Sequence, residues 1–398
     1  MSVRILRSEL SDSDIKIIRD MLILYPQTAP TYGAPSYYVQ PEEKEPIIFY
    51  LVKKNKEGIE YVWLPFSFGN VLSKRFINCS QNYPTHNFEF KSQLRENQIE
   101  VVNEALVHLN TYCSANLFLS TGYGKSVITQ FLSTQIKLLT LIVIHTTALI
   151  EQWSNDYIKN TTAKIWIIDI ANKIEIPKEF DVIITLDGRI TNIPEEILNQ
   201  IGLVVFDEVD RQLTKTRVVP FLSTQPKFII SLTATPDLRA DKMDIMSKAL
   251  SGTHYVIRRI VKNISMFKIN TNINPPVEKT SRGVDWSKLN RSLSRNLARN
   301  DIIIKLALQN YHHKILIITE FQEHCTFLYE QFKNLGKSTE YLTGNKDTYD
   351  DCRILVGTKK KVGIGFDDIN SAKNSDGIRI QVLILASSIK DESLLTQI

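Results

Sequence analysis

The chain has 398 residues, of which 43% are hydrophobic and 23% charged, and its formal net charge is +5 at pH 7. This length predicts two or three hydrophobic cores and excludes a single small domain. No apolar run approaches the roughly 20 residues that a membrane span requires, so we expect no membrane partner. The small positive surplus permits contact with nucleic acid without demanding it.

The N-terminus and the cysteines indicate in which cellular compartment the protein is expected. The N-terminus becomes charged before a long apolar region can form, which argues against a secretory signal and predicts a soluble, intracellular protein. The four cysteines, Cys79, Cys113, Cys325 and Cys352, are scattered without a CxxC pair. We therefore expect free thiols in a reducing compartment, and neither a zinc site nor a disulfide framework.

Residues 1–90 predict a small accessory α+β domain. The stretch "DIKIIRDMLILYP" suggests a helix, and "PIIFYLVKKNKEGIEYVWLPFSFG" suggests a hairpin that turns near "NKEG". The aromatic residues of these strands could stack on bases. Burial statistics favour the simpler interpretation, that they fill a small core.

From about Leu94 onward, helical periodicity alternates with short β-branched runs, which predicts parallel sheets covered by helices. We assign residues 91–252 to one α/β domain and residues 295–398 to a second. Residues 253–294 form an interdomain excursion, within which "NTNINPPVEKTSRGVDWSKLNRS" is polar and contains Pro and Gly. The predicted strands are "NLFLS", "LIVIH", "KIWIID", "DVIIT", "GLVVF" and "KFIISL" in the first domain, and "KILIIT", "TEYL", "RILVG" and "RIQVLILA" in the second.

The stretch "STGYGKS" follows the first of these strands. The simplest P-loop pattern, GxxxxGK(S/T), requires glycine where this chain has Leu119. The chemistry survives this difference, because Gly122 and Gly124 allow the backbone to turn its N–H groups toward an anion. Lys125 can then reach the outer phosphates and Ser126 can bind magnesium. Taken alone, such a stretch could still be a structural turn.

A second element strengthens the interpretation that the glycine-rich stretch binds phosphate. "IGLVVFDEVD" is an apolar strand that ends in Asp207 and Glu208. One carboxylate can hold a magnesium ion and its neighbour can polarise an attacking water. An isolated Asp-Glu pair after a strand is more often a solvated turn, but here it lies in the same α/β unit as the glycine-rich stretch.

A third element, "SLTATP", also follows an apolar strand directly. The hydroxyl groups of Thr233 and Thr235 could bond Asp210 and so connect nucleotide state to domain position. The alternative is a turn closed by Pro236. The order of the elements along the chain favours the coupling role.

In this order the elements resemble the motifs of superfamily 2 helicases. "LRENQ" is similar to the upstream glutamine element, "LSTGYGKS" to motif I, "IHTTALIEQW" to motif Ia, "DEVD" to motif II and "LTATP" to motif III. "KILIITEFQEH" is similar to motif IV and "ILVGTKKKVGIGFDDIN" to motif V. The resemblance covers roughly residues 90–398 and implies two tandem RecA-like (P-loop NTPase) domains. The leucine that opens motif I, "LIEQW" and "LTATPDLRADKMD" most resemble the UvsW and XPB type, and the transcript-release helicases of poxviruses and related large DNA viruses.

The resemblance implies roles for individual residues. The catalytic set is Lys125, Asp207 and Glu208. The ATP-binding set, in which Gln98 reads adenine, is Gln98, Ser120, Thr121, Gly122, Tyr123, Gly124, Lys125, Ser126 and Asp367. The magnesium ligands are Ser126 and Asp207. The coupling set is Asp210, Thr233, Thr235, Gly365 and Gln397. The nucleic-acid contacts are Thr146, Thr185 and Thr358, to which Lys359, Lys360 and Lys361 could add phosphate contacts, although a lysine run is usually a solvated face.

Two features depart from the pattern of the relatives. Asp210 stands in motif II where the nearest cellular relatives carry histidine. The sequence reaches Ile398 with Gln397 where motif VI would open, before the arginines of that motif. Since an arginine finger accelerates hydrolysis by roughly 10³ or more in other enzymes, its absence would leave a fragment or a much weakened ATPase.

These observations lead to one main hypothesis and two alternatives. The main one is an ATP-dependent helicase or translocase that uses ATP and Mg²⁺, acts on DNA, RNA or both, and works with transcription machinery. A viral source follows, which implies the host cytoplasm or nucleus and the virion as locations. The first alternative is a nucleotide-dependent nucleic-acid clamp with little hydrolysis. The second, a P-loop kinase or small metabolic ATPase, is disfavoured by Leu119 and by the second α/β set.

Overall fold

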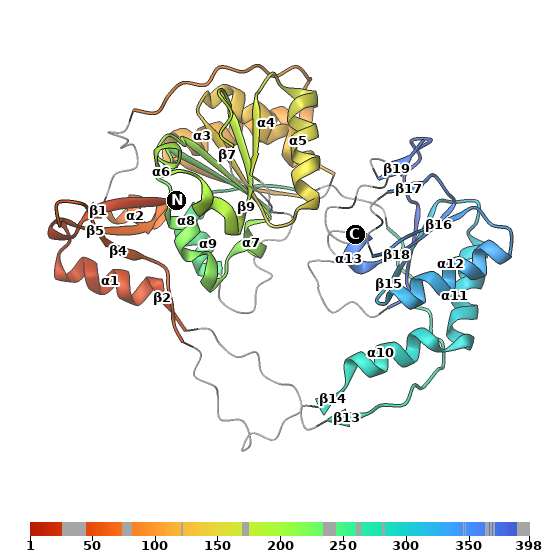
Figure 1. The fold of residues 1–398 in the computed structure, drawn as a ribbon. Helices are drawn as coiled ribbons and strands as arrows, with labels where there is room; N and C mark the ends of the chain where they lie inside the picture. The colour runs from red at the N-terminus through yellow and green to blue at the C-terminus, as the bar shows by residue number, and fades with distance from the viewer. Residues whose placement is uncertain are drawn as a thin grey trace. The chain divides into compact units, whose positions relative to one another are not determined.

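The computed structural model describes residues 1–25, 45–73, 82–120, 122–168, 175–233, 244–259, 264–280, 283–344, 346, 348–362, 366, 368 and 371–387. These residues form two compact units (Figure 1). The first unit contains the described residues up to 259, and the second contains those from 264 onward.

The first unit is built on a seven-stranded sheet with the order β12-β6-β11-β10-β7-β9-β8. Every strand pair in it is parallel. Helices cover both faces, which explains why these strands are continuous apolar runs and do not alternate with polar residues. All six predicted strands are confirmed. The strands are β6 (Ser114–Leu119), β7 (Thr140–Ile144), β8 (Ile165–Ile168), β9 (Val182–Leu186), β10 (Leu203–Asp207), β11 (Phe228–Thr233) and β12 (Tyr255–Arg258).

Two hydrophobic cores lie on the two faces of this sheet. One face packs against α3 (Glu96–Tyr112), α4 (Lys125–Ile136) and α5 (Ala148–Asn160). The helices contribute residues such as Leu109, Leu132 and Tyr157 to that core, all at most 1% exposed. The other face carries shorter elements: η2 (Asp187–Asn192), α6 (Glu195–Leu198), α7 (Val209–Gln212), η3 (Lys215–Arg217), α8 (Val218–Leu222) and α9 (Asp244–Ser251).

The N-terminal residues share the second of these cores. An antiparallel sheet of order β1-β5-β4 carries Leu64 on its central strand, and the fully buried Met1, Phe49 and Leu64 belong to one cluster with Leu141 and Phe206 of the large sheet. The predicted helix and hairpin are present. No break between compact units falls at residue 90, because this shared core joins the accessory region to the sheet. The elements are β1 (Ser2–Leu6), η1 (Arg7–Glu9), α1 (Asp12–Leu22), β2 (Ile23–Leu24), β3 (Ile47–Ile48), β4 (Leu51–Lys54), β5 (Glu60–Pro65) and α2 (Phe66–Ser73).

The second unit has a smaller four-stranded parallel sheet with the order β16-β18-β15-β20. All four predicted strands are present. Helix α10 begins at Trp286, within the residues of the predicted interdomain excursion. The elements are β13 (Lys279–Thr280), β14 (Gly283–Val284), α10 (Trp286–Arg295), α11 (Leu297–Gln309), β15 (Ile315–Thr319), α12 (Gln322–Asn334), β16 (Thr339–Leu342), β17 (Tyr349–Asp350), β18 (Ile354–Thr358), α13 (Lys359–Val362), β19 (Ala372–Lys373) and β20 (Val382–Leu385).

Two further observations concern the expected compartment. Within the described ranges, no helix combines the length and the apolar character needed to cross a bilayer. Cys113, Cys325 and Cys352 are free thiols, and Cys79 lies outside the described residues.

Candidate active site

The glycine-rich loop connects the carboxyl end of β6 to the start of α4. Gly122 and Gly124 have φ angles of +82° and +93°, in the left-handed region that favours glycine. A Cβ atom on Gly124 would lie 2.3 Å from Gln98 Nε2, whereas one on Gly122 would meet no atom within 4 Å. Gly124 is also the N-cap of α4, so the loop ends where helical N–H groups are available to an anion. Both glycines are therefore needed for the shape of the loop, and Gly124 for its packing as well.

The first turn of α3 holds this loop in place. The Gln98 side chain is 2% exposed; its Oε1 accepts from the Arg95 backbone N–H at 2.9 Å and its Nε2 donates to the Tyr123 carbonyl at 3.0 Å. The Arg95 guanidinium donates to the same carbonyl, and the Tyr123 hydroxyl donates to the Asn97 carbonyl at 2.9 Å. The sequence did not indicate this clamp. The predicted contact of Gln98 with adenine remains a prediction.

Lys125 and Glu208 form an ion pair. Lys125 Nζ lies 3.0 Å from Glu208 Oε1, and the two side chains are 17% and 10% exposed. Glu208 directly follows β10 and has a φ of +56°, an uncommon conformation for a residue other than glycine. Such conformations cluster at functional sites. The predicted phosphate-binding lysine and the predicted catalytic carboxylate therefore lie together, although 83 residues separate them in the sequence.

Asp207 is held by side chains from two helices, α5 and α7. Its carboxylate Oδ2 accepts a hydrogen bond from Trp153 Nε1 of α5 at 2.8 Å, and both side chains are buried. The Asp207 backbone carbonyl accepts from Gln212 Nε2, which also donates to the Val143 carbonyl at 3.1 Å. The helical spacing of Trp153 predicted only a core residue. A buried indole N–H needs a hydrogen-bond acceptor, and this requirement could have indicated that Trp153 also bonds a polar group.

The remaining predicted residues of the first unit differ in exposure. Thr146 is exposed in the turn before α5, where its carbonyl accepts from the Leu149 N–H at 3.2 Å. Thr185 is fully buried, and its hydroxyl donates to the Ile168 carbonyl at 3.4 Å. In this structure its side chain is therefore not exposed to a nucleic-acid strand in solution. Thr233 is 1% exposed at the end of β11, and Ser120 and Ser126 flank the loop.

Some predicted residues lie outside the description. Thr121, Thr235, Gly365, Asp367 and Gln397 are not among the described residues, and for Asp210 only the backbone, in α7, is described. Their predicted roles stay predictions.

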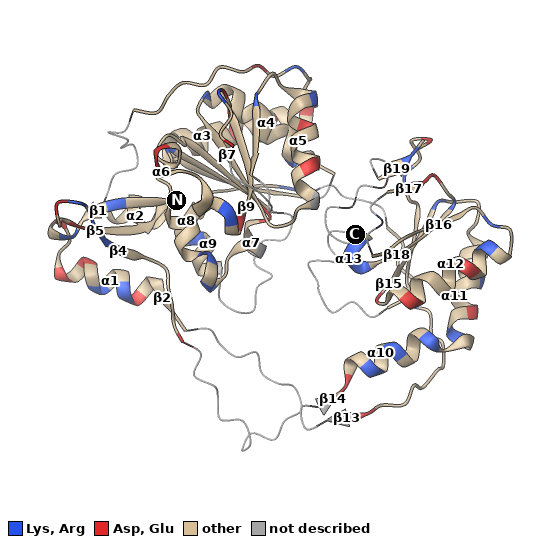
Figure 2. Cartoon of the chain, in the orientation of Figure 1, with Lys and Arg blue, Asp and Glu red and all other residues tan. Residues whose placement is uncertain are grey.

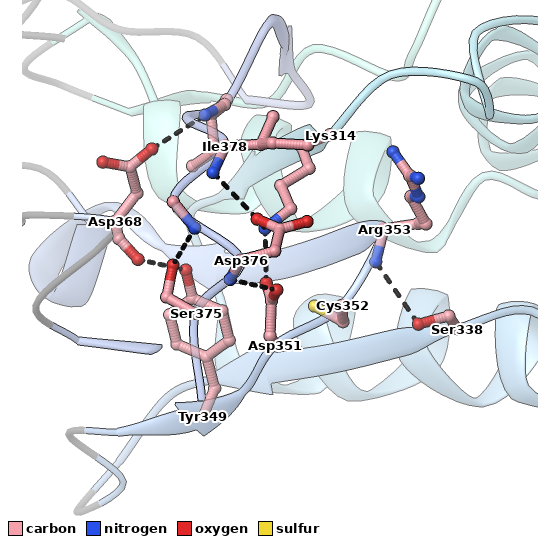
Figure 3. A network of polar contacts seen from close by, with 12 residues as sticks. Lys314, Ser338, Tyr349, Asp351, Cys352, Arg353, Asp368, Ser375, Asp376 and Ile378 are labelled. Carbon is pink, nitrogen blue, oxygen red and sulfur yellow. Dashed lines mark hydrogen bonds and ion pairs between the residues drawn. The ribbon is translucent and has the colours of Figure 1, made fainter. Parts of the chain in front are cut away.

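A polar network in the second unit anchors the chain on both sides of the predicted motif V (Figure 3). The Asp368 carbonyl accepts from the Tyr349 hydroxyl at 2.8 Å, and its carboxylate accepts from the Ile380 N–H at 2.7 Å. Lys314 Nζ, on a side chain that is only 8% exposed, lies 2.6 and 2.5 Å from carboxylate oxygens of Asp351 and Asp376. Burial opposes the charge of Lys314, but the two carboxylates outweigh it and raise its pKa.

Several basic side chains described in the second unit pair with acidic ones. On α10, Lys288 pairs with Glu278 at 2.6 Å, and Arg291 and Arg295 share Glu323 at 2.8 and 2.9 Å. Figure 2 shows basic and acidic residues interspersed along this part of the chain. Thr358 is 5% exposed at the end of β18, and Lys359, the first lysine of the run, pairs with Glu320 at 2.6 Å. The charges of α10 therefore give no single-sign surface.

The chemistry of the loop and of the two acids fits a magnesium nucleotide. The described residues contain no group of three or more His, Cys, Asp or Glu side chains that could hold a metal unaided. Magnesium in nucleotide sites needs no such group, since one or two protein ligands, waters and the substrate phosphates complete its shell. A hydroxyl at Ser126, a carboxylate at Asp207 and the glycine-dependent loop provide these elements.

Comparisons with known proteins agree with this reading. Residues 91–238 match the family described as "Type III restriction enzyme, res subunit". A protein named as a helicase, 161L of Invertebrate iridescent virus 6, is 26% identical over 338 residues, covering 77% of this chain and 75% of its own. Transcript termination protein A18 of fowlpox virus is 22% identical over 309 residues, covering 68% of this chain and 65% of its own.

A solved structure supports the fold. A fragment assigned to the HsdR subunit of a type I restriction enzyme from Vibrio vulnificus YJ016 has a TM-score of 0.50 at 15% identity, over 78% of this chain and 60% of that one. The expected α/β architecture with RecA-like parallel sheets is thus confirmed. The family match over residues 91–238 and the helicase-named viral relative support a superfamily 2 helicase of the viral type, and the solved structure supports the α/β fold.

Proposed function

We propose that the chain hydrolyses ATP to move along or unwind nucleic acid, either DNA or an RNA–DNA hybrid. The main support is the meeting of Lys125 with Glu208 at the carboxyl edge of the parallel sheet, beside a loop whose shape depends on glycine. Ligands of open α/β sheets bind at this edge.

In the proposed mechanism the loop N–H groups of residues 122–126 and the Lys125 ammonium bind the phosphates. Ser126 and Asp207 would hold Mg²⁺, which would supply positive charge to neutralise the charge that develops on the transferred phosphoryl group. Glu208 orients the attacking water. Because Lys125 is paired with Glu208 in this structure, a triphosphate must replace Glu208 as the partner of Lys125. The exchange releases the carboxylate for the water at the moment that substrate is bound.

The nucleic-acid substrate and the biological setting are also part of the proposal. Thr146, exposed in the turn before α5, contacts the sugar-phosphate backbone, and contacts of this kind make movement largely independent of base sequence. The transcript-termination name of the fowlpox relative supports a role with viral transcription machinery. Free thiols at Cys113, Cys325 and Cys352 suit the reducing interior of an infected cell.

Two substitutions test the assignment. Lys125→Ala should abolish nucleic-acid-stimulated ATPase activity, and Glu208→Gln should lower turnover by about 10² to 10⁴ while nucleotide binding persists. Lys137→Ala is the matched control, because Lys137 is an exposed lysine at the opposite end of the same helix. Turnover like that of the unmodified chain in both test variants would show that the site does not hydrolyse ATP.

A further inference from the structure

Trp153 makes a contact that core packing alone does not require. Its side chain is 3% exposed in α5, and its Nε1 donates to Asp207 Oδ2 at 2.8 Å. A buried indole could donate to any backbone carbonyl, but here it donates to a buried carboxylate at the end of β10. A hydrogen bond to a charged acceptor is roughly twice as strong as one between neutral groups. The bond therefore fixes the rotation of the Asp207 carboxylate firmly.

A second side chain donates to Asp207, in this case to its backbone carbonyl. Gln212 is fully buried, and its Nε2 donates both to the Asp207 carbonyl and to the carbonyl of Val143 on β7. The chain leaves β7 one residue after Val143 and enters α5 through Thr146. The carboxylate and the backbone of Asp207 are thus both tied to the segment made of β7, the turn at Thr146, and α5.

We propose that Trp153 is a positioning residue that orients the Asp207 carboxylate for the magnesium nucleotide, and that it transmits displacements of α5 to this carboxylate. The proposal rests on the proposed function. A hydrogen bond weakens steeply as its angle departs from linearity, so a shift of α5 alters the orientation of the carboxylate. The exposed turn at Thr146 begins the same helix, and a strand bound there would act on Asp207 through Trp153.

Trp153→Phe tests this role, because it keeps an aromatic ring and removes only the N–H donor. We expect the Mg²⁺ concentration for half-maximal binding of a fluorescent, non-hydrolysable ATP analogue to rise about 10- to 100-fold, as when partners that orient metal ligands are removed elsewhere. Stimulation of the ATPase by single-stranded DNA should also fall. Trp166→Phe is the control, since Trp166 is a buried tryptophan, 4% exposed, on β8 of the same sheet.

A double-mutant cycle separates positioning from general damage to the core. In an Asp207→Asn background, Trp153→Phe should cause no further change in the Mg²⁺ requirement, because the carboxylate it orients is gone. An equal Mg²⁺ requirement in Trp153→Phe and Trp166→Phe would overturn the proposal. The proposed function would survive that result if Lys125→Ala still abolished turnover, so the two failures can be told apart.

A second measurement applies if Trp153→Phe does not fold. The chain has four tryptophans, so ¹⁹F resonances of the 5-fluorotryptophan-labelled protein can be assigned to Trp153 by elimination with variants of the other three. Adding Mg²⁺ to the nucleotide-bound protein should shift the Trp153 resonance and leave that of Trp166 in place. A Trp153 resonance that does not respond to Mg²⁺ would overturn the proposal.

Discussion

Gly124→Ala gives a direct test of the loop geometry. Gly124 has a φ of +93°, and a Cβ atom there would lie 2.3 Å from Gln98 Nε2 and 3.0 Å from Arg95 Nη2. Gln98 cannot move aside freely, because its side-chain amide is bonded both to the Arg95 N–H and to the Tyr123 carbonyl. The substitution must therefore strain the backbone and also break the clamp that α3 places on the loop.

The two effects can be estimated separately. A residue with a side chain in the left-handed region costs about 1–2 kcal/mol. Overpacking a closed site, with loss of a buried hydrogen bond, costs a further ~1–3 kcal/mol. Gly124→Ala should thus lower the free energy of unfolding of the first unit by about 2–5 kcal/mol. Gly122 and Gly58 have φ angles of +82° and +81° with open space at the Cβ position, so alanine there should cost only the first amount.

Urea unfolding followed by tryptophan fluorescence measures these differences, since Trp63, Trp153 and Trp166 lie in the first unit. Gly58→Ala, in the hairpin turn, reports the backbone cost remote from the loop, and Gly122→Ala reports it within the loop. Combining Gly124→Ala with Gln98→Ala should recover part of the steric cost. Equal destabilisation by Gly124→Ala and Gly122→Ala would refute the packing argument.

Three further predictions concern other parts of the chain. Burial, together with a nearby arginine, lowers the pKa of His324 to about 4, so the second unit should lose at most about 3 kcal/mol as the pH falls from 6.5 toward 4. His324→Gln should flatten that profile in urea unfolding measured at pH 4.5 and 7. Lys314→Met leaves the carboxylates of Asp351 and Asp376 without their shared cation and should destabilise the second unit by ~1–3 kcal/mol. This is less than the cost of breaking a fully buried ion pair, because the Asp376 side chain is 42% exposed. Urea unfolding at neutral pH, in low and in high salt, measures the loss of stability. Thr185→Val should leave affinity for single-stranded DNA unchanged, whereas Thr146→Val should weaken it, as measured by fluorescence anisotropy.

Most strands of the large parallel sheet were predicted, because each is a short apolar run that can be recognised from its own residues without knowledge of its neighbours. Strand β12 was not predicted, because "YVIR" mixes apolar and charged residues at the edge of the sheet. Most of helix α10 falls in the predicted interdomain excursion, because the polar residues with Pro and Gly that precede it decided that prediction, although Trp286, Leu289 and Leu293 lie at helical spacing. A short edge strand such as β12 leaves a weak periodic signal.

The site was predicted only in part, and for a physical reason. Asp207 ends β10, Glu208 follows it directly, and Lys125 comes after the short loop that follows β6, so their positions at one edge of the sheet could be inferred from local pattern. The roles of Trp153 and Gln212 depend on which strands are neighbours, since β10 lies between β7 and β11. Sequence order does not determine this arrangement. The clamp of Arg95 and Gln98 on Tyr123 was missed for the same reason.

The two adjacent acids have partners of different chemical kinds, and the difference matches their proposed roles. Asp207 is the last residue of β10 and faces an indole N–H, whereas Glu208 turns into the left-handed conformation and faces an ammonium group. The bond from the indole orients the Asp207 carboxylate and leaves its formal charge in place, as a ligand of a cation requires. In the proposed mechanism, the ammonium group balances the charge of Glu208 until a bound phosphate replaces Glu208 as the partner of Lys125. The backbone turn at Glu208 is thus what allows two neighbouring carboxylates to serve one site in two ways.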